Sequence, residues 1–174
     1  MTEANAMAWD TAESLKELYD LLRKDPAQFL RLVNKQIALD PADSDNYFTR
    51  HNGWLTLDKP ELALADLNTA LQLRENHVTY EARGDLYKSL GMLHAAIADY
   101  DRAESMAPED WPEAFGPLCR ADCHARLGNE AAALADAALL PDDHWTPGID
   151  GCPAGNKQQV IAELKRRAAA ARKG

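Results

Sequence analysis

Three cysteines, together with His124 and His144 near them in the sequence, are the residues whose types and positions could carry thiol or metal chemistry. Cys119 and Cys123 are four residues apart, and His124 follows directly. Zinc sites commonly take a closer cysteine pair from a turn, and this chain contains no CxxC. A spacing of four instead puts Cys119 and Cys123 on one face of a helix, and cysteine is often buried in cores. The sequence therefore favours core packing for both, and predicts no metal site.

Cys152 lies in a different setting, within the segment PDDHWTPGIDGCPAG at 141–155. Its proline, glycine and aspartate content predicts a loop, and long ordered loops often carry function. One hypothesis is a small-molecule, metal or redox site that involves Cys152. For Trp145 there are two interpretations: it plugs the end of the fold, or it contacts a partner.

Cations and anions recur at a fixed separation elsewhere in the chain. An arginine is followed by an aspartate sixteen residues later in three places, namely Arg50 with Asp66, Arg83 with Asp99 and Arg120 with Asp136. A guanidinium binds a carboxylate through two parallel hydrogen bonds, which makes it the preferred cation for a partly buried pair. We therefore predict three structural ion pairs. The alternative is a row of arginines that binds a ligand.

Catalytic motifs are absent from the sequence. It contains no glycine-rich phosphate loop, no HExxH and no GxSxG. The scattered carboxylates fall on predicted helix surfaces, where solvation is their ordinary condition. The sequence therefore predicts a protein that is not an enzyme and needs no cofactor.

Composition limits the class of protein. The chain has 174 residues, of which 46% are hydrophobic and 27% charged, as in soluble globular proteins. It has no run of about 20 apolar residues and does not begin with the pattern of a secretory signal. The odd number of cysteines suits a reducing compartment. These features predict a cytoplasmic protein with no membrane partner.

Charge is distributed unevenly along the chain. Residues 157–174 carry six Lys or Arg and one acid, whereas residues 1–156 carry thirteen bases and twenty-seven acids. An acidic body repels the phosphates of nucleic acids, so we expect no nucleic acid partner for it. A basic C-terminal tail that binds RNA or an acidic protein is an alternative function.

The arginines also define a repeat, because they are 33 and 37 residues apart. Each unit shows two helical stripes joined by a turn. In the central unit Gly91 suits the end of the first helix, and Pro108 ends the second. The predicted single domain comprises a degenerate leading helix pair at 10–43, repeats at 44–76, 77–110 and 114–140, a loop at 141–155, and a capping helix at 156–172.

The central segment 77–110 resembles a tetratricopeptide repeat. The residues that carry the resemblance are Tyr80, Gly84, Tyr87, Gly91, Ala96, Tyr100, Ala103 and Pro108. Segment 44–76 departs from the pattern at His51, where the family has a small residue, and at Glu75, where it has proline. The resemblance implies an all-α fold, a right-handed superhelical solenoid of antiparallel helix pairs with a C-terminal capping helix.

The same resemblance implies a function. Members of this family usually hold extended peptides on the concave face lined by the first helices, which implies a non-catalytic protein-binding or peptide-binding adaptor or scaffold. The positions that point inward in the family are occupied here by Asp45, Phe48, Asn52, Leu55, Thr56, Glu81, Asp85, Lys88, Ser89, Leu118, Asp122 and Arg126. Acidic groups outnumber basic ones among them, so we expect a partner with a basic or mixed-charge segment. Apolar repeat ends also allow self-association.

Overall fold

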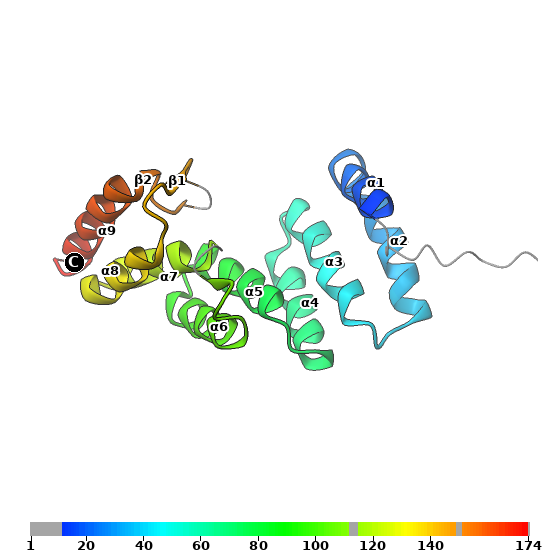
Figure 1. Cartoon of the computed structure of the whole chain (residues 1–174). Coiled ribbons are helices and arrows are strands. Elements are labelled where there is room, and N and C mark those ends of the chain that lie inside the picture. The colour runs from blue at the N-terminus through cyan, green and yellow to red at the C-terminus, as the bar shows by residue number, and fades with distance from the viewer. Residues whose placement is uncertain (1–11, 112–114, 149–150, 174) are drawn as a thin grey trace, which may run out of the picture. The chain divides into compact units, whose positions relative to one another are not determined.

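The computed structural model describes residues 12–111, 115–148 and 151–173 (Figure 1). Helices make up nearly all of the regular structure in these ranges, and the all-α prediction is confirmed. The chain divides into two compact units after Glu75, between the predicted repeats 44–76 and 77–110. No helix of the described ranges combines the length and apolar character that a membrane span needs.

The first unit consists of two successive helix pairs. They are α1 (Ala12–Lys24) with α2 (Pro26–Leu39), and α3 (Ser44–Thr56) with α4 (Pro60–Leu73). α2 packs against α3, and Phe29 and Val33 of α2 are fully buried in a core that also contains Leu18 of α1. A Cβ atom at Gly53 would lie 2.6 Å from Leu30, so α3 approaches α2 as closely as a glycine permits.

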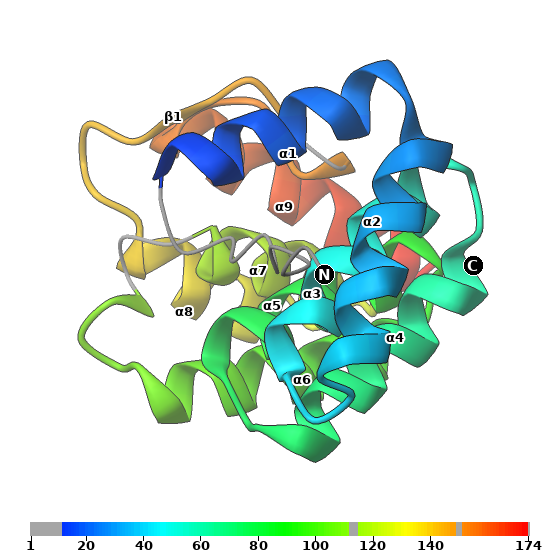
Figure 2. The ribbon, with the colours of Figure 1, turned by 90° about the vertical axis from the view of Figure 1, so that its right-hand side faces the viewer.

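The second unit repeats this arrangement and adds a final helix. It contains α5 (His77–Ser89) with α6 (Leu93–Met106), and α7 (Gly116–Arg126) with α8 (Glu130–Leu139). The final helix, α9 (Lys157–Ala171), packs against both α7 and α8, as Figure 2 shows from a second direction. Its buried residues Val160, Leu164 and Ala168 join the core of this unit.

Side-chain caps fix where several helices begin. The carboxylate of Asp25 accepts a hydrogen bond from the Gln28 amide, one turn into α2. The side chain of Asn156 does the same for α9, and Gln159 bonds back to the Asn156 amide to complete a capping box. These polar residues satisfy amides that have no partner within the helix.

The turn inside each repeat needs a left-handed backbone at one position. Gly91 and Gly128 supply it with φ of 75° and 79°, and Asp58 occupies the same register in the first unit with φ of 55°. Glycine adopts this conformation without a steric cost, and aspartate tolerates it better than most residues. The left-handed turn between the two helices therefore recurs at the same position of each repeat, eight residues after the repeat arginine.

The predicted loop at 141–155 contains a small amount of strand. Trp145–Thr146 (β1) pairs antiparallel with Gly155–Asn156 (β2), with Trp145 opposite Asn156. The indole of Trp145 is 67% exposed, whereas Thr146 is fully buried. Because successive strand residues face opposite sides, Thr146 takes the buried position and Trp145 does not plug the fold.

Candidate functional site

The predicted arginine–aspartate pairs all form in the structure. Arg50 binds Asp66 through Nε to Oδ2 at 2.8 Å and Nη2 to Oδ1 at 2.6 Å. Arg83 and Asp99 make the same two bonds, each at 2.7 Å. Each pair joins the first helix of a repeat to the second, so the guanidinium groups are held within the fold.

The third pair is part of a larger network. Arg120 donates from Nη2 to Asp136 at 2.6 Å, and from Nη1 to Asp101 at 2.7 Å and Glu104 at 2.6 Å. Burial alone would lower the pKa of Arg120, but its bonds to Asp136 and Glu104 raise that pKa overall. This cation therefore stays charged and links α7 to both α6 and α8.

The predicted inner face of α3 is largely accessible. Leu55 and Thr56 are exposed, and Phe48 and Asn52 are half-buried. Thr56 donates from its hydroxyl to the carbonyl of Asn52 at 2.9 Å. Asp45 is exposed and pairs with Arg74 at the end of α4. The face combines an amide, a hydroxyl and an apolar side chain.

The inner face of α5 carries two carboxylates one turn apart. Asp85 accepts a hydrogen bond from the Tyr100 hydroxyl at 2.6 Å. Burial raises the pKa of Glu81, and the negative charge of Asp85 adds to this against the opposing effect of His77. Ser89 at the end of the helix is exposed. A cation placed here would relieve the repulsion between the two acids.

Three residues predicted for the open face are buried instead. Leu118 is fully buried, Asp122 is almost fully buried, and Lys88 is 1% exposed. The reason is that α9 packs on α7, where Arg167 of α9 contacts the Asp122 carboxylate, and Cys152 lies against Lys88. Only Arg126 of the predicted α7 residues is exposed.

The cysteines are more closely grouped than their spacing indicated. Lys88 Nζ lies 3.0 Å from Cys152 Sγ and 3.5 Å from Cys119 Sγ, and the two sulfurs are 3.5 Å apart. Cys152 is buried rather than part of an exposed loop. Cys123 is fully buried in the core, where burial raises the pKa of its thiol to about 12. No local pattern in the sequence signals this convergence, because the path of the loop depends on tertiary contacts.

Other predicted elements of the loop do not join that group. His144 is half-buried, and Trp145 points outward on β1. Within the described ranges, no three His, Cys, Asp or Glu side chains come together in a way that could hold a metal ion. The group at Lys88 comprises its ammonium and the sulfurs of Cys119 and Cys152, with the Asp85 carboxylate close enough to act on them electrostatically.

The basic C-terminal segment directs most of its cations to neighbouring acids. Arg166 and Arg167 both bond Glu163, and these bonds lower the pKa of Glu163 to about 2. Arg172 pairs with Glu130 of α8 at 2.8 Å. Several of the C-terminal cations that the sequence suggested for binding RNA or an acidic partner therefore form ion pairs within this unit.

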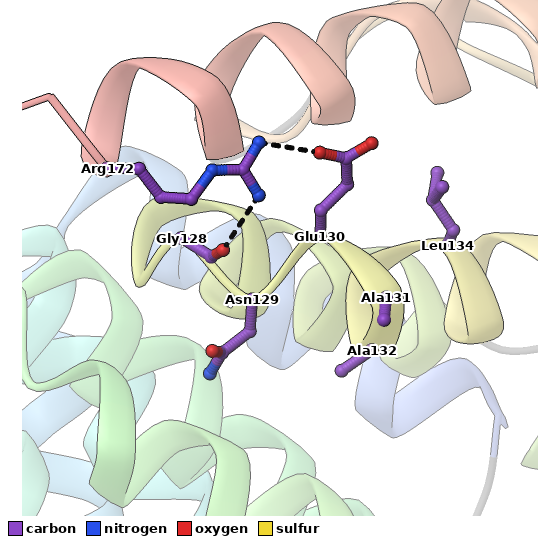
Figure 3. Close-up of a pocket in the computed structure, with 7 residues that line it drawn as sticks. All are labelled: Gly128, Asn129, Glu130, Ala131, Ala132, Leu134 and Arg172. Atoms are coloured by element: carbon purple, nitrogen blue, oxygen red, sulfur yellow. Dashed lines mark hydrogen bonds and ion pairs between the residues drawn. The ribbon is translucent and has the colours of Figure 1, made fainter.

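A recess of about 700 Å³ lies at the start of α8. Its lining residues are Gly128, Asn129, Glu130, Ala131, Ala132, Leu134 and Arg172 (Figure 3). Glu130 and Arg172 bind each other across it, and the alanines contribute only methyl groups. The recess thus lacks a set of polar groups directed at a ligand.

Comparison with known proteins identifies the repeat. Residues 79–110 match the family model of the tetratricopeptide repeat. The TPR repeat-containing thioredoxin TDX of Arabidopsis thaliana is 30% identical over 89 residues, which make up 51% of this chain and 23% of that protein. The chain thus spans less than a quarter of the length of that relative.

Two solved structures share the fold. The MamA protein superimposes with a TM-score of 0.62 at 19% identity, covering 73% of this chain and 69% of that one. A thermophilic TPR protein in Thermus thermophilus gives a TM-score of 0.58 at 21% identity, covering 93% of this chain and 87% of that one. At these identities the likeness is one of helical repeat architecture.

Proposed function

We propose, from the premise that this chain is a tetratricopeptide repeat protein, that it acts as a non-catalytic adaptor or scaffold. Proteins with this fold generally bind other proteins, and the accessible residues of α3 and α5 offer the means. Those residues are Asp45, Phe48, Asn52, Leu55 and Thr56 on α3, and Glu81, Asp85 and Ser89 on α5.

The acidic pair on α5 is the observation that carries the proposal. Glu81 and Asp85 lie one turn apart, and the pKa of Glu81 is raised by its burial and by its acidic neighbour. Among the cations of the same helix, Arg83 is bound to Asp99. The buried Lys88 interacts electrostatically with Asp85, which leaves Glu81 as the acid of the pair most available to a partner. A lysine or arginine from a partner would reduce this repulsion, which favours a basic or mixed-charge peptide.

The face of α3 adds groups that suit an extended backbone. Asn52 carries an amide that can both donate to and accept from a peptide group, and Leu55 is a large exposed apolar residue beside it. An isolated apolar side chain of this kind covers part of a ligand without requiring a deep pocket. The α3 face of the first unit suits contacts to backbone and apolar groups, and the α5 face of the second unit suits a basic group.

A peptide panel tests the proposal. Fluorescence polarisation would compare labelled extended peptides of equal length with net charges of +4, 0 and −4, at two salt concentrations. We expect the basic peptides to bind best, and Glu81→Gln to weaken them about tenfold, which corresponds to about 1.4 kcal/mol.

A matched variant provides the control. Glu61 lies in the exposed first turn of α4, which is the second helix of its repeat and not one of the first helices proposed to bind peptide. Glu61→Gln removes the same charge there. It should leave binding within about twofold of the unchanged protein. Equal losses for the two variants, or tighter binding of the acidic peptides, would contradict the assignment of the charge preference to α5.

A further inference from the structure

Three polar side chains from separate elements of the second unit meet at one buried point. Lys88 comes from α5, Cys119 from α7, and Cys152 from the segment between β1 and β2. The ammonium nitrogen is 3.0 Å from Cys152 Sγ, and the two sulfurs are 3.5 Å apart. A disulfide bond is about 2.05 Å long, so the sulfurs need to approach by about 1.5 Å to form one.

The environment makes the two thiols unequal. The pKa of Cys152 is lowered, first by the hydrogen bond from Cys119 and then by Lys88, against the opposing effect of burial. The pKa of Cys119 is raised by the same hydrogen bond and by burial. Of the two sulfurs, Cys152 is therefore the one whose surroundings favour the thiolate, because the Lys88 ammonium lies 3.0 Å from it. Such a thiolate is the nucleophilic form of cysteine.

We propose that Cys152 and Cys119 form a peroxide-sensitive dithiol that closes to a disulfide, with Lys88 as its positioning residue. This inference goes beyond the proposed binding function and does not depend on it. The co-reactant is hydrogen peroxide, because a molecule of that size suits thiols that are mostly covered by protein.

The reaction proceeds in two balanced steps. The Cys152 thiolate attacks one oxygen of hydrogen peroxide, so that an S–O bond forms and the O–O bond breaks. The departing hydroxide takes a proton and leaves as water, and Cys152 becomes a sulfenic acid. Cys119 sulfur then attacks the Cys152 sulfur, so that the S–S bond forms and the S–O bond breaks, and the departing hydroxide takes the proton of the Cys119 thiol and leaves as a second water. Overall, two thiols are oxidised by two electrons, and one peroxide is reduced to two waters.

Lys88 acts on both steps through its charge. Its ammonium lies within hydrogen-bond distance of Cys152 Sγ and stabilises the thiolate that starts the reaction. Its positive charge would also favour the departure of the peroxide oxygen that leaves as hydroxide. Because Lys88 does not itself form or break a bond, its removal should slow the reaction without abolishing it.

Closure of the disulfide would tie the loop to a helix. Cys119 lies near the start of α7, and Cys152 lies in the segment that precedes β2 and α9. The crosslink would fix the cover that already buries Lys88 on the inner side of α5. Oxidised protein should therefore melt at a higher temperature than reduced protein.

Mass spectrometry of the full chain provides the test. Reduced protein would be treated with a small excess of hydrogen peroxide, alkylated and digested with trypsin. Cleavage after Arg102, Arg120, Arg126 and Lys157 puts Cys119, Cys123 and Cys152 in three different peptides. We expect a linked species of peptides 103–120 and 127–157, while peptide 121–126 stays reduced and unlinked.

Single substitutions separate the roles of the residues. Cys119→Ser removes the resolving thiol, so a sulfenic acid should persist at Cys152 and react with dimedone. Cys152→Ser should prevent both products. Cys123 is a neighbour of Cys119 on the same helix and serves as the control. In the Cys123→Ser variant, the disulfide between Cys119 and Cys152 should form at the rate of the unchanged protein. Thermal melts of the reduced variants would verify that each is folded.

Two substitutions of Lys88 test its role as a positioning residue, by measuring the rate of Cys152 oxidation as a function of pH. Lys88→Met and Lys88→Gln should slow formation of the Cys152 sulfenic acid about tenfold at pH 7 and shift the rise in rate to higher pH. The other charged or titratable groups around the thiols are Asp85 on α5, Tyr100 on α6, Asp122, Cys123 and Arg126 on α7, and Arg167 on α9. These groups remain in both variants, so the shift reports on Lys88.

Several results would overturn the inference. One is that Cys119 and Cys152 of the folded protein stay reduced under peroxide treatment that fully oxidises the exposed methionines. Another is a predominant link that involves Cys123. An unchanged rate and pH profile in both Lys88 variants would remove that residue from the proposal. None of these readouts depends on the binding of a peptide.

Discussion

The arginine–aspartate pair has the same register in both units but different surroundings. In the first unit Arg50 is 21% exposed and binds a single carboxylate, that of Asp66. Its remaining nitrogen bonds the amide oxygen of Asn34 at 2.7 Å, and its guanidinium lies over the rings of Tyr47 and Trp54. Here one acid neutralises the cation, while neutral groups surround the rest of it.

In the second unit Arg83 is similar, with 19% exposure and a pair with Asp99, but the cation of the last repeat is more deeply buried and has more acids. Arg120 is 9% exposed and contacts the carboxylates of Asp101, Glu104 and Asp136. Two of these come from α6, the preceding repeat, and one comes from α8. The indole of Trp111 lies 5.1 Å from the guanidinium carbon.

The difference shows how one sequence period can serve two purposes. In the first unit the ion pair closes a single helix hairpin, and its strength depends on one partner. In the last repeat of the second unit Arg120, the arginine at the equivalent position, also bridges consecutive repeats, and several acids share its charge. The loss of one acid should therefore matter most where it is the sole counter-charge.

The largest expected effect is that of Asp66→Ala. Asp66 accepts two bonds from Arg50 and a third from the Trp54 indole at 2.9 Å, so its removal leaves three donor nitrogens on two side chains without this acceptor. Breaking a buried pair costs about 3 to 5 kcal/mol, and the exposure of Arg50 places this case at the lower end. Asp136→Ala should cost about half as much, because Arg120 keeps Asp101 and Glu104.

Hydrogen exchange measured by mass spectrometry checks this prediction unit by unit. Such a local measurement suits a chain with two compact units, whose unfolding need not be a single transition. Protection should fall further in α3 and α4 for Asp66→Ala than in α7 and α8 for Asp136→Ala. The opposite order would show that the number of acids does not determine the cost.

The next prediction compares two acids of α6. Asp99 is buried and supplies both acceptors for Arg83, whereas the side chain of Asp101 is 59% exposed and shares Arg120 with two other acids. Asp99→Ala should cost about 2 to 3 kcal/mol, and Asp101→Ala about 0.5 kcal/mol or less. Thermal melts of the two variants, monitored by circular dichroism, provide the measurement. Similar shifts would mean that the Arg83 pair adds little to stability.

A third prediction concerns packing at the position that follows each arginine. A Cβ atom at Gly84 would lie 2.9 Å from Cε1 of Tyr100, so Gly84→Ala forces the ring to move. The expected cost is about 1 to 3 kcal/mol. The first unit has His51 and Leu67 at the corresponding positions. Tyr100→Leu should therefore make room and reduce the penalty of Gly84→Ala.

A double-mutant cycle provides that measurement. The control substitution is Gly91→Ala, where no atom lies within 4 Å but φ is +75°, so its cost should be unaffected by Tyr100→Leu. If Tyr100→Leu changed the penalty at Gly84 and at Gly91 equally, steric contact with the ring would not be the cause.

The period of the sequence predicted the helix pairs, the three ion pairs and the glycine turns. Each of these depends on separations within about forty residues, which helical geometry converts into faces and contacts. The burial of Lys88 and Asp122 and the outward side chain of Trp145 were not predicted. They depend on where the segment 141–155 and α9 come to rest on α5 and α7, and no local pattern encodes that placement.

The smallest expected effect is a pH dependence that distinguishes the two units. Burial lowers the pKa of His51 in the first unit, and it also lowers the pKa of His124 in the second. A folded-state pKa below the unfolded value means that the neutral form is favoured on folding. This contribution to stability is complete above about pH 6.5 and is lost as the pH falls through the folded pKa.

His51→Ala separates the two units in this respect. The substitution removes the titrating group from α3, so α3 and α4 should lose less protection between pH 7 and pH 5 than they do in the unchanged protein. α7 and α8 should keep their pH dependence, because His124 remains. Exchange rates must be corrected for their intrinsic pH dependence before the comparison. If both units responded alike, the effect would have to be assigned to net charge rather than to buried imidazoles.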